Sequence, residues 1–301
     1  MTTRQLIELK WSLAFALVGI ASLALVVGTR EAPAQGRTPH VVFVTGDDEY
    51  RSEITMPMIA AILEKRHGIR TSVAYAKPIP QTKDNIEGLE ALDTADLMVM
   101  FTRFRRLPDD QLARITRFAD SGKPLVGLRT TTHAFLYPEG SPHVALNDGF
   151  GRGVFGQKWI THHGSRSTTA VTLNGAQAQH PILRGVAPFP ARSWLYHVEP
   201  LNGPAAVLLN GESINSQQAG KHETYPPNQP VAWTREHRGA RVFFTTLGHP
   251  ADFEQESMRR LVVQGILWAL GRDIPGGGAD ATPVTPYVAP ESFDLSKVPK
   301  G

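Results

Sequence analysis

The β/α pattern of the chain is set by residues 40–76, which read HVVFVTGDDEYRSEITMPMIAAILEKRHGIRTSVAYA. The apolar, β-branched run over 40–46 ends in glycine, as buried strands of parallel sheets commonly do. Apolar residues then recur at helical spacing over 52–67, and Gly68 predicts the end of that helix. Pro57 leaves a second start open, because proline is favoured at the first helical position. Residues 69–76 predict the next strand.

The same alternation continues downstream, and it predicts the fold class. A short helix is expected at 86–92, a strand at 97–101, a helix at 108–121 and a strand at 124–128. Strands that alternate with helices indicate βαβ units, and the handedness rule favours a flavodoxin-like, doubly wound parallel α/β sheet. Later strands have no helices between them, which predicts antiparallel additions before a closing helix. These expected elements are the strands 168–173, 205–209, 231–234 and 241–246 and the helix 258–270.

The composition divides the chain into a targeting segment at 1–34, an α/β domain at 38–272 and a Pro/Gly-rich, irregular tail at 273–301. The apolar run over 11–28 carries no charge, and Ala32-Pro33-Ala34 fits a signal-peptide cleavage site. We therefore expect a periplasmic or secreted protein. The alternative is an uncleaved segment that anchors the protein in the inner membrane.

The overall composition excludes several classes of function. The chain has 301 residues, a net charge of +3 and no cysteine. Without cysteine it has no disulfides, no Cys-ligated zinc, no iron–sulfur cluster and no Cys nucleophile. The small net charge and the absence of Lys/Arg runs argue against nucleic acid as a partner. The sequence makes no prediction about the oligomeric state.

Open α/β sheets bind ligands beyond the carboxyl ends of their strands. This rule selects three loops, 47–51, 102–106 and 129–135. In the first loop, Asp48 and Glu49 are candidate catalytic bases, whereas the alternative is that Asp47 or Asp48 caps the next helix. In the second loop, Arg103 is the candidate for holding a sugar or an anion through forked hydrogen bonds.

The third loop occupies the place where α/β enzymes mount a nucleophile on a strand-to-helix turn. Arg129 stands at that position and cannot attack a carbonyl, so we assign it to substrate binding. Thr130 supplies a hydroxyl for the same purpose. His133 is the candidate acid/base, and the alternative is that it is a packed polar residue.

Histidines and aromatic residues later in the chain extend the predicted site. His162 and His163 are adjacent, and neighbours on a strand point to opposite faces, so at most one of them faces a given site. We expect His163, Tyr196 and His249 to contact the substrate. No cofactor is predicted, although a metal ion held by His133, one of the adjacent pair and His249 is a weaker alternative, because the i, i+4 spacing of helical zinc ligands is missing.

Taken together, an ordered set of segments over about residues 40–275 resembles the ThuA-like family, named for trehalose utilisation. The resemblance includes the exported subgroup with a Pro-rich tail. The matching segments are 42–46, 50–51, 121–128, 162–164, 180–182, 230–234, 241–249, 259–261 and 268–271.

The resemblance implies a fold similar to class I glutamine amidotransferases and a role in carbohydrate catabolism. In that superfamily the turn after the corresponding strand carries a Cys nucleophile, and many ThuA-like members carry His there. Arg129 departs from both patterns, so glutamine amidotransferase chemistry is not expected.

Three hypotheses follow from these residues. The first is an exported enzyme that processes a sugar or keto-glycoside, with Asp48 or Glu49 and His133 exchanging protons. In this hypothesis Arg103 and Arg129 hold substrate oxygens. The alternatives are a non-catalytic sugar-binding or scaffold protein and a His-dependent metallohydrolase. The expected partner in every case is a small-molecule carbohydrate.

Overall fold

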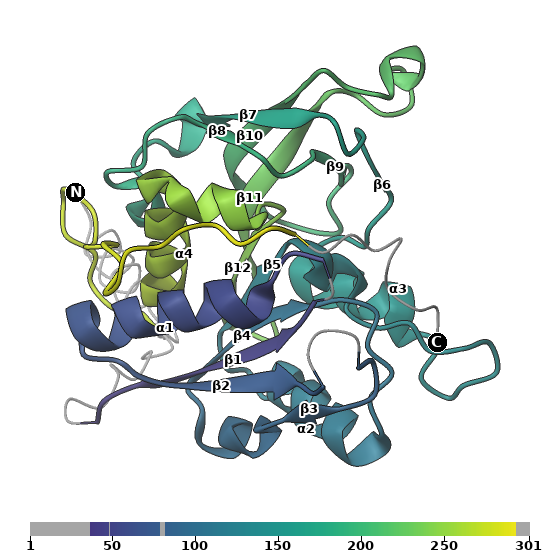
Figure 1. Cartoon of the computed structure of the whole chain (residues 1–301), viewed down its shortest axis with the longest axis vertical. Coiled ribbons are helices and arrows are strands. Elements are labelled where there is room, and N and C mark those ends of the chain that lie inside the picture. Colours follow the sequence, from purple (N-terminus) through teal and green to yellow (C-terminus); the bar gives the residue numbers. More distant parts are fainter. Residues whose placement is uncertain (1–36, 48, 79–81, 293–301) are drawn as a thin grey trace, which may run out of the picture. The chain divides into compact units, whose positions relative to one another are not determined.

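A ten-stranded mixed sheet organises the computed structural model, which describes residues 37–47, 49–78 and 82–292 (Figure 1). The strand order is β3-β2-β1-β4-β5-β12-β11-β10-β7-β8, and β6 and β9 form a separate two-stranded sheet. The predicted targeting segment lies outside the described residues. In the described part of the chain, no helix combines the length and apolar character that a membrane crossing requires.

Five adjacent strands are parallel, and their order is that of flavodoxin-like sheets. These strands are β2 (Arg70–Ala76), β1 (His40–Gly46), β4 (Leu97–Thr102), β5 (Leu125–Leu128) and β12 (Ala240–Thr245). The order changes direction between β1 and β4, which places the expected ligand crevice there. The flavodoxin-like fold class is confirmed.

Antiparallel strands extend this parallel half on both sides. The additions from the later part of the chain were predicted, except that the strand expected at 241–246 is β12, which pairs with β5 in parallel, whereas the addition at the β2 side was not predicted. The short strand β3 (Ile86–Glu87) pairs with β2 at one edge. At the other side β11 (Asn228–His237), β10 (Ala206–Ile214), β7 (Thr168–Leu173) and β8 (Phe189–Ala191) follow β12 in turn. The two-stranded sheet joins β6 (Thr161–His162) to β9 (Tyr196–His197).

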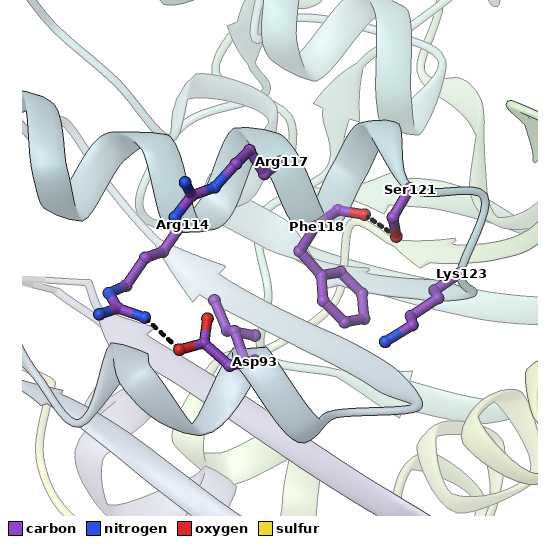
Figure 2. Close-up of a pocket in the computed structure, with 7 residues that line it drawn as sticks. Asp93, Arg114, Arg117, Phe118, Ser121 and Lys123 are labelled. Carbon is purple, nitrogen blue, oxygen red and sulfur yellow. Dashed lines mark hydrogen bonds and ion pairs between the residues drawn. The ribbon is translucent and has the colours of Figure 1, made fainter.

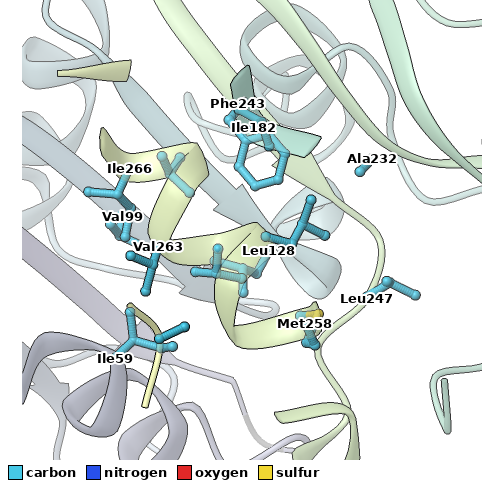
Figure 3. Packing of buried hydrophobic residues seen from close by; sticks show 14 of the residues in the cluster. Ile59, Val99, Leu128, Ile182, Ala232, Phe243, Leu247, Met258, Val263 and Ile266 are labelled. Carbon is cyan, nitrogen blue, oxygen red and sulfur yellow. The ribbon is translucent and has the colours of Figure 1, made fainter. Parts of the chain in front are cut away.

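Helices cover both faces of the parallel half because its strands are apolar on both faces. Val41 and Phe43 of β1 belong to the core under α1 (Ser52–His67) and α4 (Glu256–Ala269). Figure 3 shows Ile59 of α1 and Val263 and Ile266 of α4 in this layer, close to Val99, Leu128 and Phe243 of the sheet. The alternate residues Val42 and Val44 belong to the opposite core, with α2 (Asp109–Asp120).

The remaining helices are short: η1 (Leu89–Thr94), η2 (Arg129–His133), α3 (Leu146–Phe150), η3 (Gly151–Phe155), η4 (Gly175–Gln177), η5 (Pro181–Leu183), η6 (Ala219–Lys221) and η7 (Pro250–Glu254).

The helix predicted at 86–92 is wrong in its first half. Residues 86–87 pair with β2, and Gly88 turns the chain at a φ of 92° before η1 begins. This turn is easy for glycine alone, since it lacks Cβ.

Asp47 shapes the loop before α1. Its buried carboxylate accepts the backbone N–H groups of Glu49, Tyr50 and Ser52, the last at 3.4 Å. The helix begins at Ser52 with Pro57 inside it, so proline does not set its start. The N-cap is Arg51, whose side chain makes no capping hydrogen bond, so the capping role that the sequence allowed for Asp47 is wrong. Asp48 lies outside the described residues.

The described part of the tail, 273–292, forms neither helix nor strand. It crosses α4, where the Gln264 side chain accepts from the backbone N–H of Ala279. Further along, the Tyr287 hydroxyl donates to the carbonyl oxygen of Pro250 at 2.9 Å, and Arg51 donates to the carbonyl oxygen of Glu291. The tail therefore connects α4 to the loop after β1.

Candidate functional site

Backbone strain marks the three loops that the sequence selected. Arg51, Phe104 and Arg129 follow β1, β4 and β5, and they adopt left-handed φ values of 55°, 53° and 40°. Side chains other than glycine adopt this conformation at a cost, and such residues cluster at functional sites. Together with the crevice between β1 and β4, these loops locate the candidate site at the carboxyl edge of the sheet.

Arg129 occupies the turn after β5, and its guanidinium is fully buried. Nη1 donates to the carbonyl oxygens of Thr246 at 2.8 Å and Trp194 at 3.3 Å, and Nη2 donates to the Tyr50 hydroxyl at 3.1 Å. The guanidinium also faces the rings of Tyr50 and Tyr196, whose centroids lie 4.3 and 4.5 Å from Cζ. The loop after β12 passes close to Arg129 at Gly248, where a Cβ would lie 3.3 Å from the Cβ of Arg129.

His133 ends the same turn, with 8% of its surface exposed. Its Nδ1 lies 2.9 Å from the Thr132 hydroxyl. Burial, reinforced by the charges of Arg103 and Arg129, holds the pKa of the His133 imidazole well below its ordinary value. The ring is therefore neutral near pH 7 and has a lone pair that can accept a proton.

Aromatic rings lie next to one another along this edge, with neighbouring centroids 4.8 to 6.3 Å apart. We call this set the ring wall: Phe104, His133, Trp159, Tyr196, His162, Trp194, Tyr50 and His249. Trp159 is 37% exposed, and Phe104, His162 and Trp194 are half-buried, so solvent reaches part of the wall.

Glu49 and Arg103 face each other across the mouth of the site, from the loops after β1 and β4. Their closest oxygen and nitrogen are 3.7 Å apart, and both side chains are largely buried. Asp47, by contrast, is turned toward backbone amides. Burial raises the pKa of Asp47 to about 6 despite the amide bonds from Glu49 and Tyr50. We therefore assign Asp47 to shaping the loop and retain Glu49 as the candidate proton carrier.

His249 enters the site from the loop after β12. Its Nδ1 accepts from the backbone N–H of Ala251 at 3.1 Å, and its ring lies 6.0 Å from that of Tyr50. Burial is the main cause that lowers the pKa of His249, to about 4. The buried carboxylate of Asp252 accepts the N–H groups of His249 and Ser193, and so ties this loop to the one that carries Trp194.

The adjacent histidines separate as the alternation rule requires, and His162 is the one in the ring wall. His163 is fully buried elsewhere, with Nδ1 3.0 Å from the Ser216 hydroxyl and its ring beside that of His222. Thr130, also fully buried, lies next to Arg129, and its hydroxyl has no hydrogen-bond partner in the described part of the chain.

The structure thus brings Glu49, Arg103, Arg129, Thr130, His133, Tyr196 and His249 to one edge of the sheet, and it places His163 apart from Arg129. The sequence did not assign Tyr50, Phe104, Trp159 or Trp194 to the site, and it offered His162 only as one of two possible metal ligands. The loop position of Tyr50 and the ring-rich segment around Trp194 are the signals that could have found two of them.

A surface pocket of about 170 Å³ lies away from this edge (Figure 2). Its lining comes from η1, the end of α2 and the turn before β5: Leu92, Asp93, Arg114, Arg117, Phe118, Ser121 and Lys123. The segment that leads into β5 lies at the amino ends of the parallel strands, so this pocket is on the opposite edge from the ring wall. Arg114 pairs there with Asp93 at 2.6 Å.

Among the residues that the structure describes, no three His, Cys, Asp or Glu side chains lie close enough together to hold a metal ion. The predicted convergence of His133, His249 and one of the adjacent histidines thus stops short of a coordination shell.

A sequence model of the ThuA family, described as trehalose utilisation, matches residues 40–269. The chain belongs to the ThuA family. Two solved structures support the fold: putative ThuA-like proteins from Parabacteroides merdae and Bacteroides uniformis. The first has a TM-score of 0.55 and 16% identity, and the match covers 82% of this chain and 96% of that one. The second has a TM-score of 0.54 and 14% identity, with 80% and 96% covered.

No curated protein matches the sequence. The identities to the two ThuA-like structures are low, so those structures show the fold alone, and a shared fold does not determine the chemistry of the site.

Proposed function

We propose that this ThuA-family protein binds a sugar or keto-glycoside against the ring wall and transforms it by acid–base chemistry. Glu49 and His133 exchange protons with the substrate, while Arg103 and Arg129 hold its oxygens. The observation that carries the proposal is the position of Arg129, a buried cation at the strained turn where related folds carry a nucleophile.

The ring wall supports a carbohydrate ligand. Sugar rings present C–H groups that pack on aromatic faces, and polar edges that need directed hydrogen bonds. The half-exposed rings of Trp159 and Trp194 supply such faces. The Glu49 carboxylate and the Arg103 guanidinium lie beside them and can meet sugar hydroxyls.

The charges favour proton abstraction next to a ketone. A base removes a proton from the carbon adjacent to the carbonyl, and the electron pair moves onto the carbonyl oxygen as an enolate. Arginine stabilises that developing oxyanion. The neutral His133 ring and the Glu49 carboxylate are the two candidate bases. With a hydroxyl on the deprotonated carbon, the proton returns to the former carbonyl carbon while a proton passes between the two oxygens, and the sugar is isomerised. With the glycosidic oxygen on the β-carbon, the enolate instead expels that oxygen, which takes up the abstracted proton from the protonated base, and the glycosidic bond is cleaved. Neither outcome needs an oxidant.

A non-catalytic sugar-binding protein is the second candidate. It is favoured by the same Arg129, because a buried arginine has replaced the nucleophile and the fold can retain a ligand site without turnover. The two candidates share the ring wall and differ in whether His133 and Glu49 move protons. The proposal of a periplasmic or secreted location rests on residues 11–34 of the sequence.

The test begins with a thermal-shift screen of the protein against sugars, keto-sugars and divalent metals. Any hit is then incubated in D₂O, and its products are analysed for deuterium on carbon. Acid–base catalysis predicts deuterium uptake that is lost in His133→Gln or Glu49→Gln. Glu90→Gln, at an exposed position near α2, is the matched control.

Binding without deuterium uptake or a product would support the non-catalytic alternative. An activity that requires an added metal, and that His133→Gln leaves intact, would overturn the proposed roles. Amino-terminal sequencing of the protein secreted from cells tests cleavage after Ala34.

A further inference from the structure

The described part of the tail, 273–292, runs from α4 to two of the loops that build the candidate site (Figure 1). Its first half is firmly packed, and Ala279 and Ala281 are each 1% exposed. The Arg259 side chain of α4 donates to the carbonyl oxygen of Ala281 at 3.0 Å. The second half of the tail therefore starts from a fixed point on α4.

The second half of the tail is attached to η7, the turn that follows His249. The Tyr287 hydroxyl donates to the carbonyl oxygen of Pro250, the first residue of η7, at 2.9 Å. The backbone N–H of Ala289 donates to the carboxylate of Glu254, the last residue of η7, at 3.1 Å. Both ends of this turn are therefore bonded to the tail.

Tyr287 is suited to this attachment. Its ring packs against the core under α1 and α4, which fixes the direction of the hydroxyl group. Burial, and then the charges of Glu254 and Asp252, raise the pKa of the Tyr287 hydroxyl well above its ordinary value. The hydroxyl therefore keeps its proton and remains a hydrogen-bond donor near neutral pH.

The tail then reaches the loop after β1. Nη1 of Arg51 donates to the carbonyl oxygen of Glu291 at 3.3 Å. Arg51 directly follows Tyr50 and has a left-handed φ of 55°, a conformation that persists only where neighbouring contacts support it. The ring of Tyr50 lies 6.0 Å from that of His249. One short piece of the tail is thus bonded to both loops whose rings meet in the ring wall.

We propose that tail residues 286–292 form a strap that positions Tyr50 and His249 relative to each other, with Tyr287 as the positioning residue. Asp252 holds the same His249 loop through the backbone N–H of His249, and the strap is a second, separate attachment. The inference goes beyond the proposed function, because it concerns how the site keeps its shape and not what the site transforms. Without the strap, the two loops move independently and water reaches the His249 ring.

Hydrogen exchange measured by mass spectrometry tests the strap on the full-length protein without a ligand. Tyr287→Phe removes the hydroxyl and keeps the ring. Tyr137→Phe is the matched control, because its hydroxyl also donates to a backbone carbonyl oxygen, that of Leu107, at 2.9 Å. Loss of one hydrogen bond corresponds to about a five-fold change in an equilibrium constant. Tyr287→Phe should therefore speed exchange in peptides covering 248–255 about five-fold, and Tyr137→Phe should leave these peptides unchanged.

Deletion of residues 286–301 tests both loops together. Exchange should become faster in peptides covering 47–52 as well as in those covering 248–255. The second readout is the His249 ring, whose titration is followed by NMR on protein with labelled histidine. Burial is the main cause that lowers the pKa of His249, to about 4.

In the deletion variant the pKa of His249 should rise toward its ordinary value of 6.5, because the ring becomes hydrated. The charges that also act on this ring, those of Asp252, Arg129 and Arg192, are present in both proteins, so the shift reports exposure. A tail that only stabilised the fold would leave this titration as it is in the wild type.

Equal exchange of the 248–255 peptides in Tyr287→Phe and Tyr137→Phe overturns the strap, and so does a His249 titration that the deletion leaves unchanged. If the deletion variant does not fold, the two tyrosine variants decide by themselves. A wild-type protein that binds no sugar overturns the proposed function and leaves the strap standing, because neither readout uses a ligand.

Discussion

Asp252→Asn offers the most direct test of how the site is held together. Asp252 is 1% exposed, and its two oxygens accept five hydrogen bonds. One oxygen takes the backbone N–H of Arg192 at 2.6 Å and that of Ser193 at 3.1 Å. The other oxygen accepts a hydrogen bond from the Ser193 hydroxyl. It also accepts the backbone N–H groups of Gly248 and His249, both at 3.1 Å.

The substitution keeps the shape of the side chain and replaces one acceptor by a donor. Whichever oxygen is replaced, at least two donors lose that acceptor and face an N–H₂ group. A buried donor left unsatisfied costs about 1–3 kcal/mol. The Ser193 hydroxyl also accepts from the N–H groups of Gly248 and His249, and it offsets part of the loss. We therefore expect Asp252→Asn to lower the free energy of unfolding by about 3 kcal/mol.

The assay is urea denaturation followed by circular dichroism, with ligand affinity measured on the same samples. Asp120→Asn, at an exposed position on α2, should stay within about 0.5 kcal/mol of the wild type. Because Asp252 joins the loops of Trp194 and His249, sugar affinity should fall as well. An Asp252→Asn protein within about 1 kcal/mol of the wild type, with unchanged affinity, would refute this account of the site.

Three further perturbations test other parts of the structure. Gly151→Ala places a Cβ 2.2 Å from the backbone carbonyl oxygen of Thr132, the residue before His133, and should destabilise the folded protein by about 2 kcal/mol. In the control Gly153→Ala the new Cβ meets open space and stability should not change. Equal melting temperatures for the two variants would contradict this. Tyr287→Phe removes the hydrogen bond to Pro250 and should cost about 1 kcal/mol by chemical denaturation; no loss means the tail is not braced there. Burial lowers the pKa of His163 and His249 from 6.5 to about 4, so the unfolded chain binds protons before the folded one, and the free energy of unfolding should fall as the pH drops from about 6.5 to 4. Burial raises the pKa of Asp47 to about 6, which has the opposite effect on stability in this range. A melting temperature that stays constant over this pH range in calorimetry would contradict the prediction.

Much of the fold could be predicted because its signals are local. The boundaries of β7 and α1 agree with the residues expected from alternation and from the glycine after the helix. The segment 86–92 could not be predicted in the same way. Whether it forms a strand depends on the neighbouring β2, and a two-residue pairing leaves no periodicity to detect.

The candidate site was predictable in location but not in detail. The rule on strand ends placed Arg129 and His133 correctly at the carboxyl edge. It could not choose between His162 and His163, because that choice depends on how β6 pairs with β9. Nor could it reveal that Arg129 lies between two tyrosine rings, since the second ring comes from a strand far along the chain.

The ends of the large sheet bear on how copies of the protein meet one another. An exposed edge strand offers a row of free amide and carbonyl groups onto which another chain can add. Here one edge strand has two residues, and the other has three, with Pro190 at its centre. Proline donates no amide hydrogen, so that short edge is interrupted as well. Ten strands therefore end in borders too short for a second copy to continue the sheet, which protects an unusually wide sheet from edge-to-edge aggregation.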